Sequence, residues 1–388
     1  MPKTQLRPAE APLTIEWLTS PGQMESISDE WRELEQAVQN RTALSTFDFL
    51  ATWYRHYAGD YGGALRIGLA RRGSRLVGVA PLTLRRGSIA RVPVTRVDFA
   101  PNDSPVGAFL VEDDHPEIVT ALLQSLVQTE KVDVVCLNGF DPGSAHLTML
   151  QEAAPTLGLT VALEDEASAV ADLRGGYQAY RATLSGHFRR NLNARARKIA
   201  AAGRTSIEGV VLSDGVETTE KSIARMIAIT EASYKLQGRR LGDNHRDYLY
   251  ELGKRFGPRG MLSLTFLTID GEDAAYLFGL VERGCFYDIN LSYDERFEKL
   301  SPGTFLTQKT MEMLEAKGIH TVVSHGAHEY KKFWATEFVP EKRVFLFASS
   351  VKGTAARLVR FSLAPLWRRL AASASARSDG ASARPVAA

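Results

Sequence analysis

The sequence predicts an α/β (α+β) fold of two consecutive domains, each with a mixed, mostly antiparallel sheet flanked by helices. Residues 261–334 carry the first observation, because they read as three strands, a helix, a strand and a further short helix. Residues 64–137 carry the second, since a hairpin, further strands, a helix and a strand follow in the same order. The length of 388 residues is sufficient for two or three domain-sized cores. These observations indicate a duplicated fold with a cleft between its halves.

Composition excludes several classes of protein. Hydrophobic residues make up 44% of the chain and charged residues 24%, as in globular proteins. The 47 basic and 45 acidic residues give a net charge of +2, which provides no overall attraction to nucleic acid or to a membrane. We therefore expect no DNA partner, and any binding to a charged surface must be local.

The cellular location is predicted from what the sequence lacks. No stretch has the length and apolarity of a membrane-spanning helix, and no signal-peptide core follows Met1. The two cysteines, Cys136 and Cys285, both lie in apolar runs, which indicates buried thiols rather than a disulfide. We therefore expect a cytoplasmic protein.

The first predicted domain covers residues 13–174 and follows a flexible arm at 1–12. A helix is expected from Ser28, because capping and acidic residues stand together there. The turn residues Arg72-Gly73-Ser74 separate two β-type runs and predict a hairpin. The other expected elements are strands at 15–18, 65–70, 76–84, 92–99, 106–111, 132–137 and 159–163, and helices at 49–57, 116–128 and 142–157.

The second predicted domain covers residues 175–350. The dipeptides Asp270-Gly271 and Arg283-Gly284 separate three β-type runs, which predicts two consecutive hairpins. Leucines and arginines at 351–370 predict a basic amphipathic helix, and the patternless 371–388 predicts a disordered tail. The other expected elements are helices at 177–184, 186–202, 226–237, 245–256 and 302–317, and strands at 262–269, 274–281, 285–291 and 319–324.

The start of the helix at 302–317 is the first candidate binding site. In the run Ser301-Pro302-Gly303, the serine can cap the helix, the proline suits the first helical position and the glycine leaves the backbone accessible. A helix N-terminus offers free N–H groups and the positive end of a dipole, and so suits a phosphate. An ordinary capped helix explains the same residues, and both interpretations stay open here.

The strand at 285–291 is the second candidate site. Asp288 and Asn290 alternate with apolar neighbours, so strict alternation would direct both side chains to the same face of the sheet. An ionisable carboxylate at such a position is a candidate general base, and a carboxylate paired to a nearby arginine is the structural alternative.

Three motifs together resemble the GNAT acyltransferase superfamily: Ser301-Pro302-Gly303, the strand at 319–324 and the segment Tyr330-Lys331-Lys332-Phe333-Trp334. Within it the chain is similar to the CelD-like (cellulose-biosynthesis-type) acetyltransferases, which in turn resemble Fem-type peptidyltransferases. The similarity is good over about 176–347, including the basic segment at 188–192, and looser before it. The chain departs from the superfamily pattern by keeping a single glycine in the pyrophosphate loop and by placing His325-Gly326-Ala327-His328 at a usually acidic position.

The resemblance implies tandem GNAT-like domains and an acyltransferase that uses acetyl-CoA or another acyl-CoA as its co-substrate. Transfer from a thioester needs a base, a stabilised oxyanion and an acid for the leaving thiolate. We expect Asp288 to be the base, with Asn290 beside it. Tyr330 stands where the superfamily often keeps a tyrosine as general acid, although a tyrosine that packs on the helix is the alternative. The expected cofactor-binding residues are Ser301, Gly303, Thr304 and Lys331.

Arginines in the second domain suggest an acceptor site. Guanidinium groups bind phosphate and carboxylate in a bidentate manner, which fits an anionic acceptor such as a nucleotide-linked or lipid-linked sugar. A basic, solvated helix face explains them equally well. The residues are Arg189, Arg190, Arg197, Arg239 and Arg240.

The His-x-x-His spacing of His325 and His328 is a weak indication of a metal site. A third ligand with suitable spacing is missing, so we expect no metal. One of the two imidazoles could instead be the base for the acceptor, because histidine titrates near neutral pH.

Two classes of function follow. The first is an acyl-CoA-dependent N- or O-acyltransferase that acts on a small molecule or on a cell-envelope or polysaccharide precursor; the resemblance leaves aminoacyl-tRNA-dependent, Fem-like transfer as a variant. The second is a non-catalytic scaffold of a bacterial exopolysaccharide machine, with the basic helix at 351–370 on the inner face of the membrane. Packing of that helix on the chain's own core is the alternative. The sequence does not define the acyl chain, the acceptor or the oligomeric state.

Overall fold

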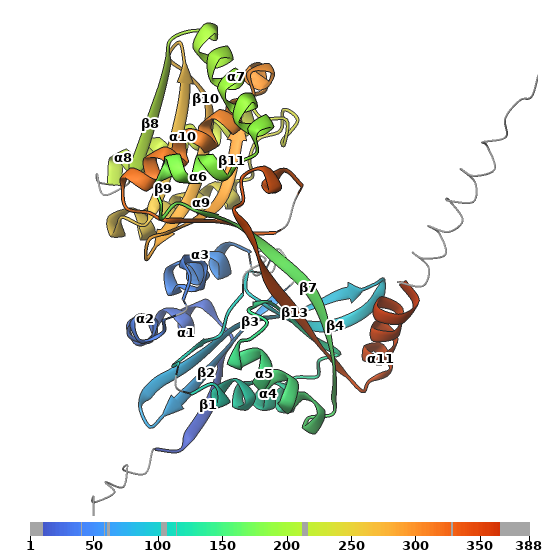
Figure 1. Ribbon diagram of the computed structural model, residues 1–388. Helices are drawn as coiled ribbons and strands as arrows, with labels where there is room; N and C mark the ends of the chain where they lie inside the picture. Colours follow the sequence, from blue (N-terminus) through green and yellow to red (C-terminus); the bar gives the residue numbers. More distant parts are fainter. Residues whose placement is uncertain are drawn as a thin grey trace, which may run out of the picture.

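The computed structural model describes residues 11–39, 41–57, 59, 63–101, 107–113, 115–211, 216–326 and 329–364. Within these residues 13 strands form a single mixed sheet with helices on both faces (Figure 1). The strand order is β1-β2-β3-β4-β6-β13-β7-β12-β11-β10-β9-β8, and β5 pairs with β3. Among the pairings of the described strands, only β4 with β6 and β11 with β12 are parallel. The predicted α/β fold class is therefore confirmed.

The N-terminal half comprises the elements from β1 to β6. Helices α1 to α3 connect β1 to β2, and α4 connects the β4–β5 region to β6. The strands are β1 (Leu13–Leu18), β2 (Gly63–Arg72), β3 (Arg75–Ile89), β4 (Val92–Phe99), β5 (Leu110–Val111) and β6 (Val134–Phe140). The helices are α1 (Pro21–Glu25), α2 (Ser28–Ala37), η1 (Ala43–Ser45), α3 (Phe47–Tyr57), α4 (Glu117–Thr129) and α5 (Ala145–Thr156).

The C-terminal half repeats this order from β8 onwards. Helices α8 and α9 connect β8 to β9, and α10 connects β11 to β12. The strands are β8 (Thr205–Val211), β9 (Leu262–Ile269), β10 (Glu272–Glu282), β11 (Cys285–Tyr293) and β12 (Thr321–Ser324). The helices are α6 (Tyr177–Thr183), α7 (Gly186–Ala202), α8 (Val216–Glu231), α9 (Asp243–Phe256), η2 (Gly257–Arg259), η3 (Glu295–Leu300), α10 (Pro302–Ala316) and η4 (Glu329–Phe333).

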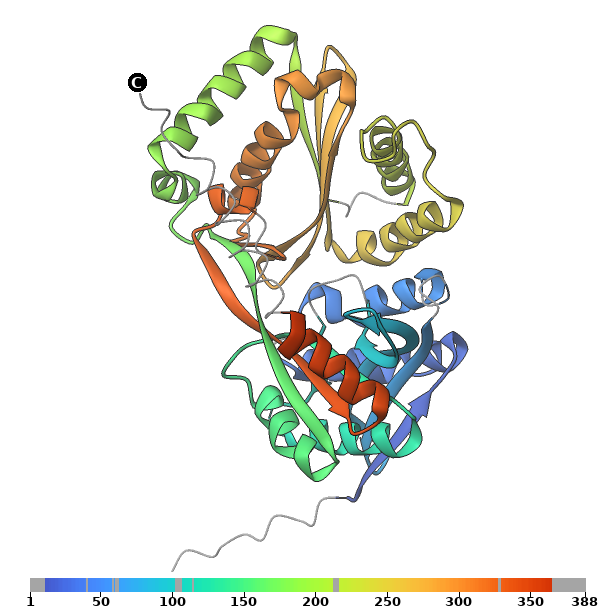
Figure 2. The same ribbon diagram turned by 90° about the vertical axis from the view of Figure 1, so that its right-hand side faces the viewer.

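Two long strands exchange between the halves. Strand β7 (Leu159–Asp172) leaves the N-terminal half and ends beside β12, whereas β13 (Glu337–Ala348) leaves the C-terminal half and pairs with β6. The two strands pair with each other along 337–348 and cross from one half to the other (Figures 1 and 2). The expected boundary between 174 and 175 therefore does not separate two independent sheets.

Most predicted elements are present, and the hairpin turns form where turn residues predicted them. Asp270 and Gly271 both have positive φ (53° and 85°), as the two central residues of a type I′ turn require. Arg283 and Gly284 do the same between β10 and β11 (48° and 74°). The sequence failed to predict α1, β8 and β13, underestimated the length of β7, and overestimated the strand that becomes β5. The helix expected at 226–237 is α8 at Val216–Glu231, so it was predicted too far along the chain.

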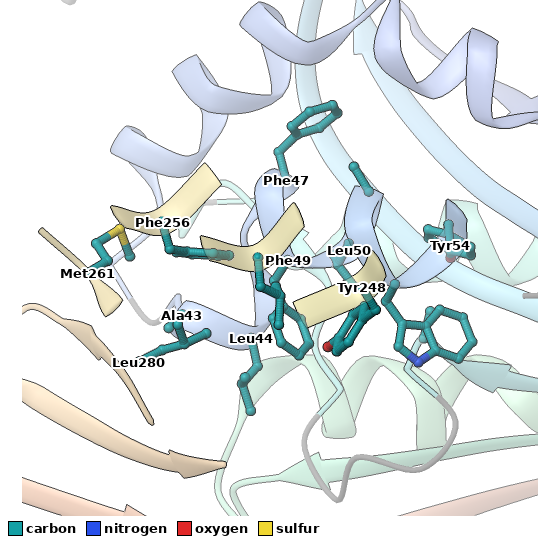
Figure 3. Close-up of a cluster of buried hydrophobic side chains, with 14 of the residues drawn as sticks. Ala43, Leu44, Phe47, Phe49, Leu50, Tyr54, Tyr248, Phe256, Met261 and Leu280 are labelled. Atoms are coloured by element: carbon teal, nitrogen blue, oxygen red, sulfur yellow. The ribbon is translucent and has the colours of Figure 1, made fainter. Parts of the chain in front are cut away.

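Helices on the two faces of the C-terminal sheet belong to different hydrophobic cores. Helices α6, α7 and α10 pack on one face. Helices α8 and α9 pack on the other face, together with the loop and helix α3 of the N-terminal half. Figure 3 shows this junction, where Leu44 and Phe49 of the N-terminal half lie near Tyr248 of α9. The core between the halves is therefore shared.

The predicted basic helix begins at Val351 with α11 (Val351–Leu358) and continues as a π-helical turn at 359–363. Ala356 is buried, and the ring of Phe361 lies 5.4 Å from that of Phe345 in β13, so this helix packs on the chain's own sheet. None of the helices in the described ranges has the length and apolarity needed to cross a lipid bilayer. The expected N-terminal arm up to residue 10 and the tail beyond residue 364 lie outside the described residues.

Candidate functional site

The site lies where the two parallel strands of the C-terminal half separate. Strand β11 pairs with β12 only through Cys285, Phe286 and Tyr287, and beyond these residues the strands diverge. A β-bulge follows, because Asp288 pairs with Gly279 of β10 and Asn290 with Phe278. Ile289 has no partner in the register of either neighbouring strand, so it is the extra residue of a bulge at the edge of the gap.

The gap opens into a cavity of about 810 Å³. The C-terminal half contributes strands β11 and β12 and the apolar side of α10 at Met311 and Leu314. The N-terminal half contributes Phe49 and Trp53, which stand one turn apart on α3. The predicted cleft between the halves is therefore present and is largely apolar, with polar groups concentrated in the gap.

Asp288 lies in the wall of this cavity. Its carboxylate accepts a hydrogen bond of 2.9 Å from the hydroxyl of Ser324 on β12. Burial raises the pKa of Asp288 above its ordinary value, and the Ser324 hydrogen bond opposes the rise. The ammonium groups of Lys331 and Lys235 also oppose this rise in pKa. A carboxylate with a raised pKa is better matched to proton transfer near neutral pH than an ordinary one.

His325 follows β12 directly and also lines the cavity. Its Nδ1 atom lies 3.2 Å from the hydroxyl of buried Ser168, and its buried Nε2 atom has no hydrogen-bond partner among the described residues. Burial lowers the pKa of His325 to about 4, so the imidazole is neutral at pH 7. Lys331 donates a hydrogen bond to the His325 carbonyl and is itself buried. Nε2 is the unprotonated nitrogen of this neutral ring in the tautomer whose Nδ1–H donates to Ser168.

The alternation that placed Asp288 and Asn290 on one face is wrong, because the bulge at Ile289 interrupts it. Asn290 does reach the cavity, but its amide donates to the hydroxyl of Tyr276 on β10 at 2.9 Å. Its carbonyl oxygen accepts from Lys235 at 3.1 Å. Asn290 therefore fixes Lys235 at the cavity rather than assisting Asp288 from a neighbouring position on the strand.

Tyr330 lies at the rim of the cavity in η4, and its side chain is 60% exposed. Partial burial and the negative charge of Asp288 raise the pKa of Tyr330, so its phenol is protonated at neutral pH. The Lys331 ammonium lies 5.8 Å from the centroid of the Tyr330 ring. A protonated phenol at the rim is suited to donate a proton to a leaving group.

The start of α10 differs from the expected capped, accessible turn. Ser301 has left-handed backbone angles (φ 56°, ψ 52°), and its side chain does not cap the helix. Gly303 is buried, and a Cβ atom there would lie 3.1 Å from Leu291, so this glycine permits close packing of α10 on β11. Neither residue, nor Thr304, lines the cavity, although Thr307 one turn later does. The N–H groups of the first turn still lack helical partners.

The five predicted acceptor-binding arginines lie outside the cavity. Arg189 is partly exposed, and Arg190 and Arg197 are exposed on α7. Arg239 and Arg240 are exposed in the loop between α8 and α9, whose helices cover the opposite face of the sheet. Among the described residues, no carboxylate forms an ion pair with any of the five arginines. The structure therefore separates them into two groups.

Sequence reasoning missed several residues of the site. Ser324 and Lys235 carry no motif, and only the tertiary structure brings them to Asp288 and Asn290. Phe49 and Trp53 read as ordinary core positions of an amphipathic helix. For the metal hypothesis, His328 lies outside the described residues, and no metal-ligand cluster of three residues occurs in the ranges that the structure describes.

Comparisons with known proteins identify a related domain family and similar folds. Residues 186–332 match the model of the "Acetyltransferase (GNAT) domain" family. The crystal structure of FemX superposes with a TM-score of 0.55 at 13% identity, over 89% of this chain and 100% of that chain. A protein described as the C-terminal domain of a lysylphosphatidylglycerol synthetase from Agrobacterium fabrum gives a TM-score of 0.51 at 14% identity, over 87% of this chain and 95% of that chain.

L-PGS from Bacillus licheniformis also gives a TM-score of 0.51, at 13% identity, over 88% of this chain and 96% of that chain. Comparison with the sequences of curated proteins gives no match. The CelD-like similarity is therefore not confirmed at the level of a subfamily. Residues 186–332, which include Asp288, His325 and both strands of the gap, match the GNAT acetyltransferase domain family, and the fold of nearly the whole chain is similar to that of FemX and the lysylphosphatidylglycerol synthetase structures.

Proposed function

We propose that this protein is an acyl-CoA-dependent N- or O-acyltransferase. The observation that carries the proposal is the convergence of Asp288, His325 and Tyr330 on one cavity at the gap between β11 and β12. The bulge residue Ile289, which pairs with no residue of either neighbouring strand, lies at the same gap. A base, an acid and oriented backbone donors are the groups that acyl transfer from a thioester requires.

The reaction follows from the positions of these groups. The acceptor nitrogen or oxygen attacks the acyl carbonyl and loses its proton to Asp288, whose raised pKa suits this step. We propose that the N–H of the bulge residue Ile289 stabilises the oxyanion and that Lys331, which lines the same cavity, adds a positive charge. The carbon–sulfur bond then breaks, and Tyr330 protonates the leaving thiolate. His325 is the second candidate base, because it lines the same cavity and its imidazole is neutral at pH 7.

We propose that the donor binds along α10. Thr307, Met311 and Leu314 line the cavity along the helix, while the N–H groups of Gly303 and Thr304 in the first turn and the positive end of the dipole lie at its start. A thioester arm in the cavity would bring the phosphates of coenzyme A to that first turn. This arrangement supports an acyl-CoA donor.

A negative charge introduced at the start of α10 tests whether the phosphates of the donor bind there. Thr304→Glu should weaken binding of acetyl-CoA, because the new carboxylate repels phosphate, while the fold is retained since an acidic residue suits a first turn. Thr304→Gln is the matched control. Thermal stabilisation by acetyl-CoA should be smaller for Thr304→Glu than for wild type and Thr304→Gln. Turnover of an N-acetylcysteamine thioester, which lacks phosphates, should be equal in all three proteins. Equal stabilisation by acetyl-CoA in all three would exclude this phosphate site.

An aminoacyl-tRNA donor is the second candidate, because the fold is similar to that of FemX. A tRNA binds through many phosphates, so its affinity falls steeply with salt, whereas that of a small donor falls gently. We propose that the exposed arginines of α7 take part in either case, by contacting tRNA or by contacting an anionic cell-envelope acceptor. Measuring donor affinity at several salt concentrations, for wild type and Arg190→Ala, separates the tRNA donor from the small donor. A donor affinity that falls steeply with salt, and less steeply in the variant, indicates tRNA.

A scaffold without catalysis is the remaining alternative, and it predicts no ligand-dependent change. If no acyl-CoA, acyl thioester or aminoacyl-tRNA stabilises the wild-type protein or is consumed by it, the enzyme proposal fails. Thiol release from acyl-CoA with a panel of amine and hydroxyl acceptors is the direct measurement.

A further inference from the structure

A second cavity, of about 470 Å³, lies between the halves and is lined mainly by charged side chains. Helix α3 separates it from the main cavity, since Phe49 and Trp53 line the main cavity and Asp48 lines the second. Both halves contribute to its wall. The lining residues are Arg32, Glu35, Gln36, Arg41 and Asp48 of the N-terminal half, and Arg255 and Arg259 of the C-terminal half.

Three of the arginines converge on one carboxylate. Buried Asp48 accepts from Arg32 at 3.0 Å and from Arg255 at 3.3 Å, and its other oxygen accepts from Arg259. A single negative charge cannot neutralise three guanidinium groups, and the repulsion between these groups is strong where water is partly excluded. The cluster therefore has unbalanced positive charge.

Neighbouring acids balance only part of this charge. Arg255 also pairs with Glu25 at 2.8 Å and with Glu251 at 2.9 Å, neither of which lines the cavity. Among the residues that the structure describes, the one further ion-pair partner of Arg32 is Asp29, at 3.4 Å, and that carboxylate is 95% exposed, so water and salt screen it. Within the described residues Arg259 pairs with Asp48 alone. Arg32 and Arg259 therefore hold the excess charge.

The other two charged lining residues do not remove this excess. Arg41 is neutralised by Glu282 at 2.7 Å. Glu35 accepts a hydrogen bond from the backbone N–H of Phe47, and among the described residues it forms no ion pair with Arg32 or Arg259. Burial raises the pKa of the Glu35 carboxyl group, while the Phe47 hydrogen bond and the charges of Arg259 and Arg41 oppose this rise.

Arg32 and Arg259 are also held in place with hydrogen-bond donors to spare. Each guanidinium group has five N–H donors, and the side chain of Arg32 is 38% exposed and that of Arg259 35% exposed. The Arg32 guanidinium stacks over the ring of buried Phe47 at 4.9 Å from its centroid. Fixed, partly desolvated guanidinium groups on two sides of a small cavity form a site for a tetrahedral oxyanion.

We propose that this cavity binds a small anion of the phosphate class, held by Arg32 from one half and Arg259 from the other. The anion balances the charge that Asp48 leaves unneutralised. It also joins the two halves at a point separate from the main cavity. The proposal does not depend on the acyltransferase assignment.

Titration calorimetry with inorganic phosphate and with pyrophosphate, at constant ionic strength, tests the site. We expect saturable binding to the wild-type protein with a Kd near or below about 1 mM. Arg259→Gln should weaken it at least about tenfold, because a charge-assisted hydrogen bond is lost. The matched control is Arg55→Gln, since Arg55 pairs with Glu25 and Glu251 in the same network but does not line the cavity. That variant should bind as the wild type does.

Three results would overturn the proposal: no saturable heat and no thermal stabilisation with either anion, equal affinity in Arg259→Gln and wild type, or an equal loss in Arg55→Gln and Arg259→Gln. The last would show that general positive charge, rather than this cavity, attracts the anion. Circular dichroism establishes that each variant is folded. If Arg259→Gln does not fold, Arg32→Gln is measured in its place with the same expected loss.

Discussion

The two halves of the molecule place different residues at the same point of the same fold. In the C-terminal half the parallel pairing ends at Tyr287 and Val323, and the next residues are Asp288 and Ser324. In the N-terminal half it ends at Asp98 and Cys136, and the next residues are Phe99 and Leu137, both 1% exposed. The polar pair that lines the cavity in one half is therefore an apolar pair in the other.

The N-terminal gap is filled with aromatic rings. Phe99 packs on Phe109 with 4.9 Å between ring centroids and on Phe140 with 5.9 Å. A Cβ atom on Gly107 would overlap the ring of Phe99, so this glycine permits the close packing. The duplicated half thus keeps the strand geometry of a ligand site but fills the space, and it contributes to function through the α3 wall of the main cavity.

The carboxylates nearest to each gap also differ in their partners. Asp98 is buried and accepts from Arg85 and from Arg96, each at 2.9 Å. Asp288 accepts from a neutral hydroxyl, and the nearest ammonium groups do not pair with it. A carboxylate with two guanidinium partners is structural, whereas one that is partly buried at a cavity without an ion pair is available for proton transfer.

The largest expected effect is in the N-terminal half. Asp98→Asn should lower the free energy of unfolding by about 2–4 kcal/mol, because a buried carboxylate is lost and two partly buried guanidinium groups lose their counter-charge. Denaturant unfolding measures this change, and turnover of the remaining folded protein should be normal. Asp165→Asn is the control, since Asp165 pairs with Lys342 but is 87% exposed. Equal stability of Asp98→Asn and Asp165→Asn would contradict the structural role of Asp98.

In the C-terminal half the matching substitution should act on catalysis. Asp288→Asn should lower kcat by about a hundredfold or more, the usual contribution of a general base. Acyl-CoA affinity should barely change. Asp273→Asn, which removes a carboxylate of β10 that pairs with Arg225 away from the cavity, should keep normal kcat. If Asp288→Asn keeps normal kcat across the pH range, the base is His325, and His325→Gln should then show the loss.

A smaller effect is expected at the rim. Tyr330→Phe should lower kcat by about tenfold to a hundredfold, at or below the low end for a general acid, because water reaches this exposed phenol and can replace it in part. The fall of kcat at high pH that reports loss of the phenolic proton should disappear in the variant. An unchanged pH profile and rate would leave Tyr330 with a packing role only.

The smallest effect concerns stability and pH. The folded pKa of Asp288 is raised, so the fold binds its proton more tightly than the unfolded chain does, and ionisation of Asp288 destabilises the fold. Asp288→Asn should therefore raise the free energy of unfolding at pH 7, by about 1 kcal/mol or less. The gain should vanish below the unfolded pKa of about 3.9. Thermal unfolding from pH 3 to 7 measures it, and a gain that does not depend on pH would exclude this cause.

The sequence by itself determined the fold class and most elements of both halves. Turn dipeptides such as Asp270-Gly271 and Arg283-Gly284 have local requirements for positive φ, so they located the hairpins correctly. The helical periodicity of apolar residues located α7, α9 and α10, because the buried face of a helix places apolar residues three or four positions apart in the sequence. The sequence also predicted a site in the C-terminal half, from Asp288 in the strand at 285–291 and from Tyr330 in the segment at 330–334.

Only the tertiary structure decided how the site is built. The bulge at Ile289, which redirects Asn290, depends on the register of two strands, and no local pattern fixes a register. The exchange of β7 and β13 joins residues more than 160 positions apart, so it leaves no local signal. The filled gap beside Phe99, the Ser324 partner of Asp288 and the arginines that meet at Asp48 are likewise contacts between distant segments. Turns and helices depend on residues that are neighbours in the sequence, whereas a cavity and its charge balance arise from the packing of distant segments.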